Sequence, residues 1–212
     1  MRLFSLCLIA TALIACAPAT AQHRTATVSP EAKPLVDAAR DRLKSLVIYD
    51  GRYMRLDYPG GDVPSPMGVC TDVVIRSLRN AYGFDLQKGV HEDMKENFSI
   101  YPALWGHTKA DKNIDHRRVP NLEIYFYRMG YDLPITKDPA DYQPGDIVAW
   151  RLDGNTGEGG PAHIGIVSDC VSLSGIPLII HNIGGGVEES DMLFDHQITG
   201  HFRVDGEILG KP

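Results

Sequence analysis

Gly159-Gly160-Pro161-Ala162-His163-Ile164-Gly165-Ile166-Val167 is a glycine-rich turn that leads into an apolar strand. Similar apolar runs occur at 147–150, 177–181 and 198–204, and they are separated by turns rich in Gly and Asp. Short apolar runs bounded by such turns are typical of β-strands. This pattern predicts that the C-terminal half of the chain forms an antiparallel sheet.

The N-terminal half has a different period. Leu35, Ala38, Ala39, Leu43 and Leu46 recur at helical spacing, which predicts a helix over 30–46. We expect further helices over 70–82, 91–98 and 120–129, and a long loop rich in Gly and Pro over 51–69. Helices followed by antiparallel strands indicate an α+β fold, with the N-terminal helices packed on the C-terminal sheet.

The first 21 residues have the features of an export signal, namely a short basic start, an apolar stretch and then small residues. Ala19-Thr20-Ala21 fits simple cleavage, which we favour, and this leaves a single domain over 22–212 in the periplasm. Leu13-Ile14-Ala15-Cys16 also fits a lipoprotein signal, and lipidation of Cys16 would tether the domain to the outer membrane. The net charge of 21 − 27 = −6 does not indicate a nucleic-acid partner.

Cys70 follows the Gly/Pro loop and is the first residue of a predicted helix. The positive end of the helix dipole favours the thiolate, which is the reactive nucleophile. Asp72 lies in the same turn and opposes this effect, and Arg76 is placed where it could neutralise Asp72. The alternative is a buried, inert cysteine.

Two histidines at strand ends could complete a catalytic site. His163 stands at the entrance of an apolar strand, where it could accept the Cys70 proton and later donate it to a leaving amine. His181 or Asn182 ends another apolar run and could orient His163, although only one of these neighbours can face it. The alternatives are that His163 is a satisfied histidine at a strand edge and that His181 marks a strand end that meets the turn at Gly184-Gly185-Gly186.

Cys70 and Cys170 are the two cysteines of the expected mature domain, and export permits a disulfide between them. Cys170 lies roughly 23 Å from His163 if the strand is straight, since a strand rises ~3.3 Å per residue. A disulfide brings the Cα atoms within ~7 Å. A bond to Cys170 and a contact between Cys70 and His163 therefore exclude each other.

These motifs, in order, resemble those of the papain-like cell-wall peptidases of the NlpC group, relatives of the CHAP amidases. The similar segments are Tyr58-Pro59-Gly60-Gly61, the helix that begins at Cys70, the Pro-Gly-Asp turn over 143–148, and the strands of His163 and His181. The resemblance implies a papain-like fold, Cys70 as nucleophile, His163 as base and His181 as the orienting group. It also implies that Tyr58 and the backbone N–H of Cys70 stabilise the oxyanion. The group usually has Asp-Cys-Ser-Gly, whereas this chain has Val69-Cys70-Thr71-Asp72.

A second resemblance, to a bacterial domain of unknown function allied to that group, spans most of the mature chain. This resemblance rests on the segments 58–62, 68–76 and Asn113-Ile114-Asp115-His116-Arg117-Arg118. The last segment is a basic spot on an acidic protein, and Arg binds carboxylates through two parallel hydrogen bonds. We therefore predict a substrate-binding region at Asp115 to Arg118, in which Arg117 or Arg118 binds a substrate carboxylate. The alternative is an internal salt bridge.

The sequence thus predicts an exported, monomeric cysteine peptidase or amidase that cleaves amide bonds in peptidoglycan stem peptides without a metal or other cofactor. One alternative is a domain of the same fold that binds muropeptides without cleaving them. Another is a zinc hydrolase, which eight histidines permit, although no H-E-x-x-H motif is present.

Overall fold

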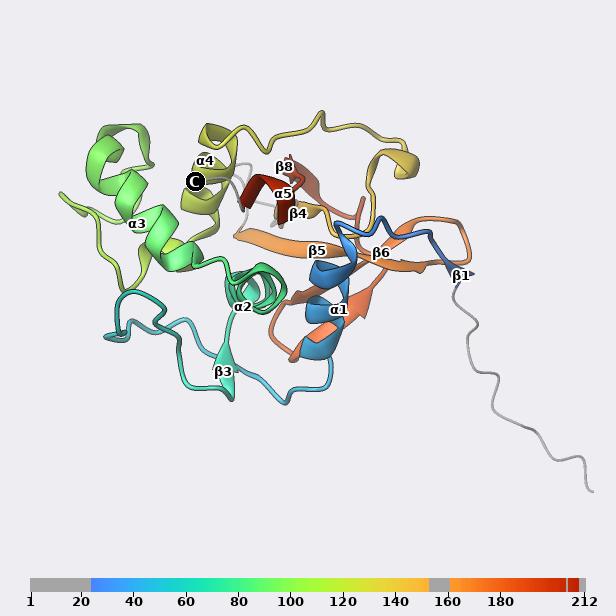
Figure 1. Ribbon diagram of the computed structural model, residues 1–212, viewed down its shortest axis with the longest axis horizontal. Coiled ribbons are helices and arrows are strands. Elements are labelled where there is room, and N and C mark those ends of the chain that lie inside the picture. Colours follow the sequence, from blue (N-terminus) through green and yellow to red (C-terminus); the bar gives the residue numbers. More distant parts are fainter. Residues whose placement is uncertain (1–23, 153–160, 205, 210–212) are drawn as a thin grey trace, which may run out of the picture.

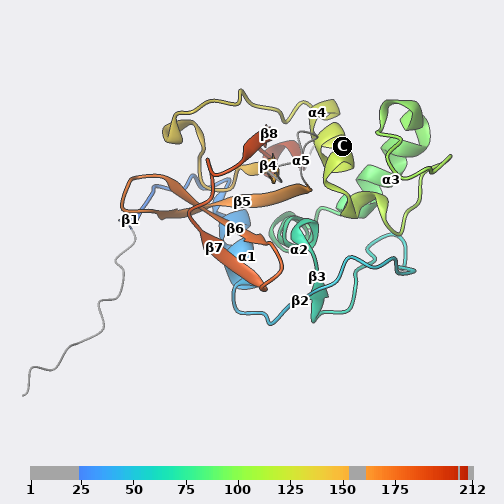
Figure 2. The ribbon, with the colours of Figure 1, turned by 180° about the vertical axis from the view of Figure 1, so that it is seen from behind.

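The computed structural model describes residues 24–152, 161–204 and 206–209 (Figure 1). It has the predicted α+β architecture, in which helices pack on an antiparallel sheet. Figures 1 and 2 show α1 and α2 against the strands β5 and β6, and α3 and α4 together at one end of the molecule. The predicted signal segment with Cys16, and the turn over 153–160, lie outside the described residues.

The four longer helices lie close to their predicted positions. They are α1 (Lys33–Arg42), α2 (Cys70–Tyr82), α3 (Leu86–Asn97) and α4 (Val119–Arg128), and a short α5 (Gly206–Leu209) follows the last strand. Helix α3 begins earlier than predicted because Asp85 caps it, with its carboxylate accepting bonds from the N–H groups of Gln87 and Lys88 at 3.1 and 3.3 Å. Helix α2 ends at Gly83, whose φ of 67° suits glycine.

The main sheet has the strand order β7-β6-β5-β4-β8, and β1 pairs with β5 outside this order. Within the described residues, the paired strands of this sheet are antiparallel. The strands are β1 (Arg24–Thr25), β4 (Ile147–Arg151), β5 (Ala162–Val171), β6 (Pro177–Asn182), β7 (Val187–Ser190) and β8 (Gln197–Phe202). The sequence did not predict β1 and β7, which are short and mostly polar. Nor did it predict the small parallel pair β2 (Ile48–Tyr49) and β3 (Met67–Gly68).

The sheet separates two apolar cores. Ile164 and Ile166 of β5 belong to the larger core, which also contains residues of α1, α2 and α4, including Cys70. Val167 of β5 and Trp150 of β4 belong to a smaller core on the other face, together with Tyr142 and Leu193. Because side chains alternate along a strand, this division fixes the face on which each residue of β5 lies. None of the described helices is long and apolar enough to span a bilayer.

Candidate active site

Cys70 is the first residue of α2 and only 5% exposed, and it lines a cavity of about 620 Å³. Residues from six separate segments share this cavity: Tyr49, Gly51, Val69, Leu104, Trp105, Arg117, Arg118, Val119, Pro120, Arg151 and Ala162. Cys70 and Cys170 are both free thiols, so the disulfide considered for the mature domain is not formed. The cavity gives a buried thiol access to a ligand of moderate size.

The start of α2 is held by a buried ion pair. Val69 is extended, and its N–H donates to the Asp72 carboxylate at 2.7 Å, which fixes the turn that carries Cys70. Arg117 donates to the same carboxylate from Nε and Nη2, at 3.0 and 2.8 Å. Arg76 instead binds Asp62, with 2.9 Å between its Nε and Oδ2, so Arg117 is the residue that neutralises Asp72. Arg117 therefore forms the internal salt bridge that was the alternative to binding substrate.

Burial raises the pKa of the Cys70 thiol to about 11, and the nearby Asp72 carboxylate acts in the same direction. The backbone N–H groups of Ile164 and Thr71 and the Tyr49 hydroxyl act in the opposite direction, although more weakly. The low thiol pKa expected from the helix dipole is therefore not found, because desolvation outweighs it. At neutral pH this cysteine is a protonated thiol that needs a base.

His163 and His181 are in direct contact. His163 Nε2 and His181 Nδ1 are 3.0 Å apart, and His181 Nε2 is 2.7 Å from Ser190 Oγ on β7. Burial lowers the pKa of His163 to about 3 and that of His181 to about 4, so both imidazoles are neutral at neutral pH. Of the two candidates for the orienting residue, His181 is the one that contacts His163, whereas the side-chain Oδ1 of Asn182 accepts a bond from the Gly184 N–H.

The side chain of His163, a residue of β5, lies on the face of the sheet opposite to Cys70. His163 is the register partner of Trp150, and its ring lies 6.0 Å from that ring, on the face with the smaller core. Cys70 lies on the other face and interacts with the backbone N–H of Ile164, the next residue. No hydrogen bond joins Cys70 to His163, both of which are described, so the contact expected from the sequence is absent in this state of the molecule.

The tyrosine beside the thiol is Tyr49 rather than Tyr58. The Tyr58 hydroxyl lies 3.4 Å from Glu92, and its ring meets His91 edge-on at 5.1 Å, outside the residues that line the Cys70 cavity. Tyr49 pairs with Gly68 across β2 and β3, which brings its side chain to the start of α2. No pattern in the sequence indicates this residue, because a two-residue parallel bridge between distant segments has no local signature.

The segment from Asp115 to Arg118 is divided between the interior and the cavity. Asp115 and His116 are both 2% exposed, and the Asp115 carboxylate accepts a bond from the Asp111 N–H. Burial lowers the pKa of His116 to about 4. Arg118 lies over the Trp105 ring at 3.9 Å and lines the cavity. Of these four residues, only Arg117 and Arg118 reach the cavity wall.

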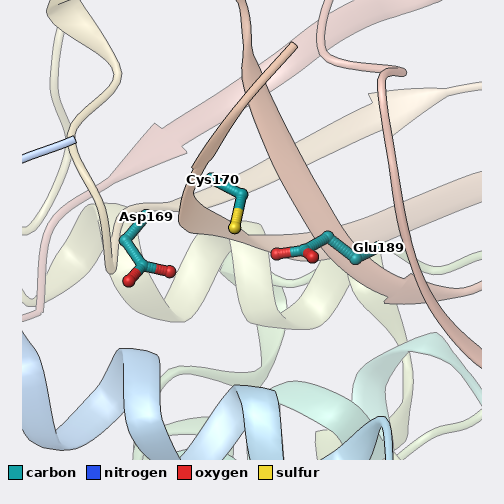
Figure 3. Close-up of side chains that lie close together, drawn as sticks. All are labelled: Asp169, Cys170 and Glu189. Carbon is teal, nitrogen blue, oxygen red and sulfur yellow. The ribbon is translucent and has the colours of Figure 1, made fainter. Parts of the chain in front are cut away.

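Asp169, Cys170 and Glu189 form a cluster on β5 and β7 (Figure 3), with ligand atoms within 4.8 Å of one another. Arg40 of α1 already supplies a cation there. Its Nη2 donates to the Asp169 carboxylate and lies 3.3 Å from the Glu189 carboxylate. The same nitrogen is 3.6 Å from Cys170 Sγ. One guanidinium therefore already offsets part of the negative charge of this cluster, and we do not assign a metal to it.

The pattern of DUF1287, a domain of unknown function, matches residues 36–204. The chain belongs to the DUF1287 family. This DUF1287 domain is 54% identical over 169 residues to the uncharacterised protein YijF of Escherichia coli (strain K12), covering 80% of each chain. A solved N-acetylmuramoyl-L-alanine amidase from Bacteroides uniformis ATCC 8492 aligns with a TM-score of 0.49 at 16% identity, covering 84% of this chain and 100% of that chain.

Proposed function

We propose that this DUF1287 domain is a cysteine hydrolase that cleaves amide bonds in peptidoglycan stem peptides. The observation that carries the proposal is that Cys70, the first residue of α2, lines a cavity of about 620 Å³. The ordered resemblance of the Cys70, His163 and His181 segments to papain-like NlpC peptidases suggests the fold group and the substrate. A papain-like thiol needs a base and an orienting group, and His163 in contact with His181 fits these two roles.

In the proposed reaction, Cys70 Sγ attacks the amide carbonyl while its proton passes to His163. The proton then goes to the departing amine, and water hydrolyses the resulting thioester to regenerate the thiol. His181 holds His163 Nε2, so Nδ1 is the ring nitrogen for proton transfer. In the described state the two side chains lie on opposite faces of β5, so we propose that substrate binding rearranges this end of β5 and brings Nδ1 to the sulfur. The Tyr49 hydroxyl lies beside the sulfur, where it can donate to the developing oxyanion.

The test is mass spectrometry of purified muropeptides incubated with the wild type and with Cys70→Ser and Cys70→Ala variants. We expect the wild type to release a peptide fragment and both variants to lose this activity by at least a hundredfold. Cys170→Ser is the matched control, because Cys170 lies next to Arg40 rather than in the cavity. Unchanged muropeptides with the wild type, or full activity of Cys70→Ala, would contradict the proposal.

A non-catalytic muropeptide-binding domain is the second candidate. It is favoured by the raised pKa of Cys70 and by the missing hydrogen bond between Cys70 and His163. The two candidates differ in one measurement, since a binding domain leaves muropeptides intact and keeps its affinity for them in Cys70→Ala. Calorimetric titration of both proteins with the same muropeptide separates the candidates.

We also propose that the domain is exported to the periplasm, with residues 1–21 as the signal. The N-terminal residue of the protein isolated from cell envelopes tests this. Gln22 at the N-terminus indicates simple cleavage, and a lipid-modified Cys16 that Cys16→Ser abolishes indicates an outer-membrane lipoprotein. An uncleaved chain beginning at Met1 would contradict export by this route.

A further inference from the structure

Arg118 is a half-buried cation on the wall of the Cys70 cavity. Its guanidinium lies 3.9 Å above the Trp105 ring, and its Nη2 is 3.2 Å from His107 Nε2. Arginine is only a donor, so His107 Nε2 accepts this bond. The stacking and the bond together hold the guanidinium plane in place and use one of its five N–H groups.

Arg118 differs from the other cavity arginines in having no carboxylate partner. Arg117 is paired with Asp72 at 2.8 Å, and Arg151 with Glu123 at 3.0 Å. Within the described part of the chain, no carboxylate oxygen lies within 4.0 Å of the Arg118 guanidinium. Asp115 and Asp111 act on it only at longer range, and burial lowers its pKa. Arginine stays charged even so, which leaves a partly desolvated cation unpaired beside the thiol.

We propose that Arg118 binds a carboxylate of the substrate and so selects peptides that carry a free carboxylate close to the cleaved amide. This inference rests on the proposed function for the substrate class, whereas the anion site itself can be tested without turnover. A planar guanidinium binds a carboxylate through parallel N–H bonds, and such charge-assisted bonds are stronger than neutral ones. Trp105, Leu104, Val119 and Pro120 make the adjoining wall apolar, which strengthens the attraction by excluding water.

Two alkylating reagents of nearly equal size test the anion site. Iodoacetate carries a carboxylate and iodoacetamide does not, and both react with the same Cys70 thiolate. The ratio of their rate constants is therefore independent of the thiol pKa. We expect Arg118→Gln to lower the iodoacetate-to-iodoacetamide ratio at Cys70 about tenfold, equivalent to about 1.4 kcal/mol. Peptide mass spectrometry of the full-length chain measures Cys70 and Cys170 separately.

The controls separate a specific site from general charge. Arg55→Gln removes the same charge from an exposed residue outside the cavity. It should leave the ratio within about twofold of the wild type, and Arg118→Lys should lower the ratio less than Arg118→Gln does. A ratio in Arg118→Gln within about twofold of the wild type, or an equal drop in Arg55→Gln, would overturn the proposal.

Protection of the wild-type chain gives a second readout that does not depend on the folding of a variant. Two pairs of ligands are compared. The first is N-acetyl-alanyl-alanine and its C-terminal amide, which differ in an α-carboxylate. The second is N-acetyl-glutamate amide and N-acetyl-glutamine amide, which differ in a side-chain carboxylate. We expect the acid of at least one pair to slow alkylation of Cys70 by iodoacetamide, but not of Cys170, and its amide to have no effect. The protecting pair identifies which carboxylate Arg118 binds, and protection by neither acid would overturn the proposal. This readout requires no cleavage. A negative result therefore overturns the anion site without affecting the hydrolase proposal, and an absence of cleavage overturns the hydrolase proposal without affecting the anion site.

Discussion

Arg117 and Asp72 form a buried ion pair directly behind the thiol, in which Nε and Nη2 of Arg117 lie 3.0 and 2.8 Å from the two carboxylate oxygens. Their side chains are 2% and 4% exposed. Asp72 also accepts the Val69 N–H, so one carboxylate joins the start of α2 to the η2 turn (Asp115–Arg117). The position of Cys70 thus depends on a residue 47 positions further along the chain (117 − 70 = 47).

Replacing Arg117 should be strongly destabilising. Arg117→Gln leaves the buried Asp72 charge unpaired, and breaking a buried pair in this way costs about 3–5 kcal/mol. We expect this decrease in the unfolding free energy from urea titration at neutral pH. Lys33→Gln breaks an exposed pair with Asp37 and should not shift the midpoint measurably. Equal midpoints for the two variants would show that the Asp72 pair does not stabilise the fold.

Removing the Tyr49 hydroxyl should make Cys70 less reactive. Its hydrogen bonding lowers the pKa of Cys70, so Tyr49→Phe should raise that pKa further above the wild-type value of about 11. The rate of iodoacetamide alkylation as a function of pH measures this directly, and we expect a several-fold slower reaction at mildly alkaline pH. Tyr58→Phe is the control, since Tyr58 contacts Glu92 and should leave the profile unchanged. A slower reaction in Tyr58→Phe, with no change in Tyr49→Phe, would show that the Tyr49 hydroxyl does not lower the pKa of Cys70.

Local patterns were sufficient for most of the fold. Helix α2 runs from Cys70 to Tyr82 as predicted, because its apolar stripe and Gly83 are both readable in the sequence. Strands β4 and β6 match their apolar runs to within one residue. The register of β5 with β6, which brings His163 to His181, agrees with the pairing that the sequence proposed for the two histidines.

The site was less predictable because it depends on long-range contacts. Arg76 lies one turn from Asp72, yet Arg117 takes that carboxylate from another segment. Tyr49 reaches the thiol through a two-residue parallel bridge, and no periodicity indicates such a bridge. The face on which His163 lies follows from its pairing with Trp150, which a single strand pattern cannot define. Burial, which sets the pKa of Cys70, is likewise a property of the folded chain.

Stability should fall in mild acid. Burial lowers the pKa of His163 to about 3 and those of His181 and His116 to about 4, whereas unfolded histidines titrate near ~6.5. As the pH drops below ~6.5, these histidines become protonated in the unfolded state but stay neutral in the folded state. The stability that is present above that pH is therefore lost progressively toward about pH 4. Each histidine contributes up to about 1.4 kcal/mol per pH unit.

Urea unfolding at about pH 7 and about pH 5.5 measures this slope. His116→Asn should reduce the dependence by about one histidine's share, because His116 lies apart from the hydrogen-bonded pair His163 and His181. Stability that is equal at the two pH values would contradict the neutral, buried state of these rings.

Gly165 keeps the two histidines in register, and its replacement should disturb them. A Cβ at this position would lie 2.6 Å from Ile179 Cγ2 and 3.1 Å from His181 Cβ, so β6 must move away from β5 to admit it. We expect Gly165→Ala to lower the unfolding free energy by about 1–3 kcal/mol, as overpacking of a core usually does. Muropeptide cleavage should fall further than the loss of stability accounts for, since His163 would lose the partner at its Nε2.

Gly185→Ala is the matched control, because a Cβ there meets nothing within 4 Å. Equal thermal midpoints and equal activities for the two variants would mean that close packing of β5 on β6 is not what holds His181 against His163.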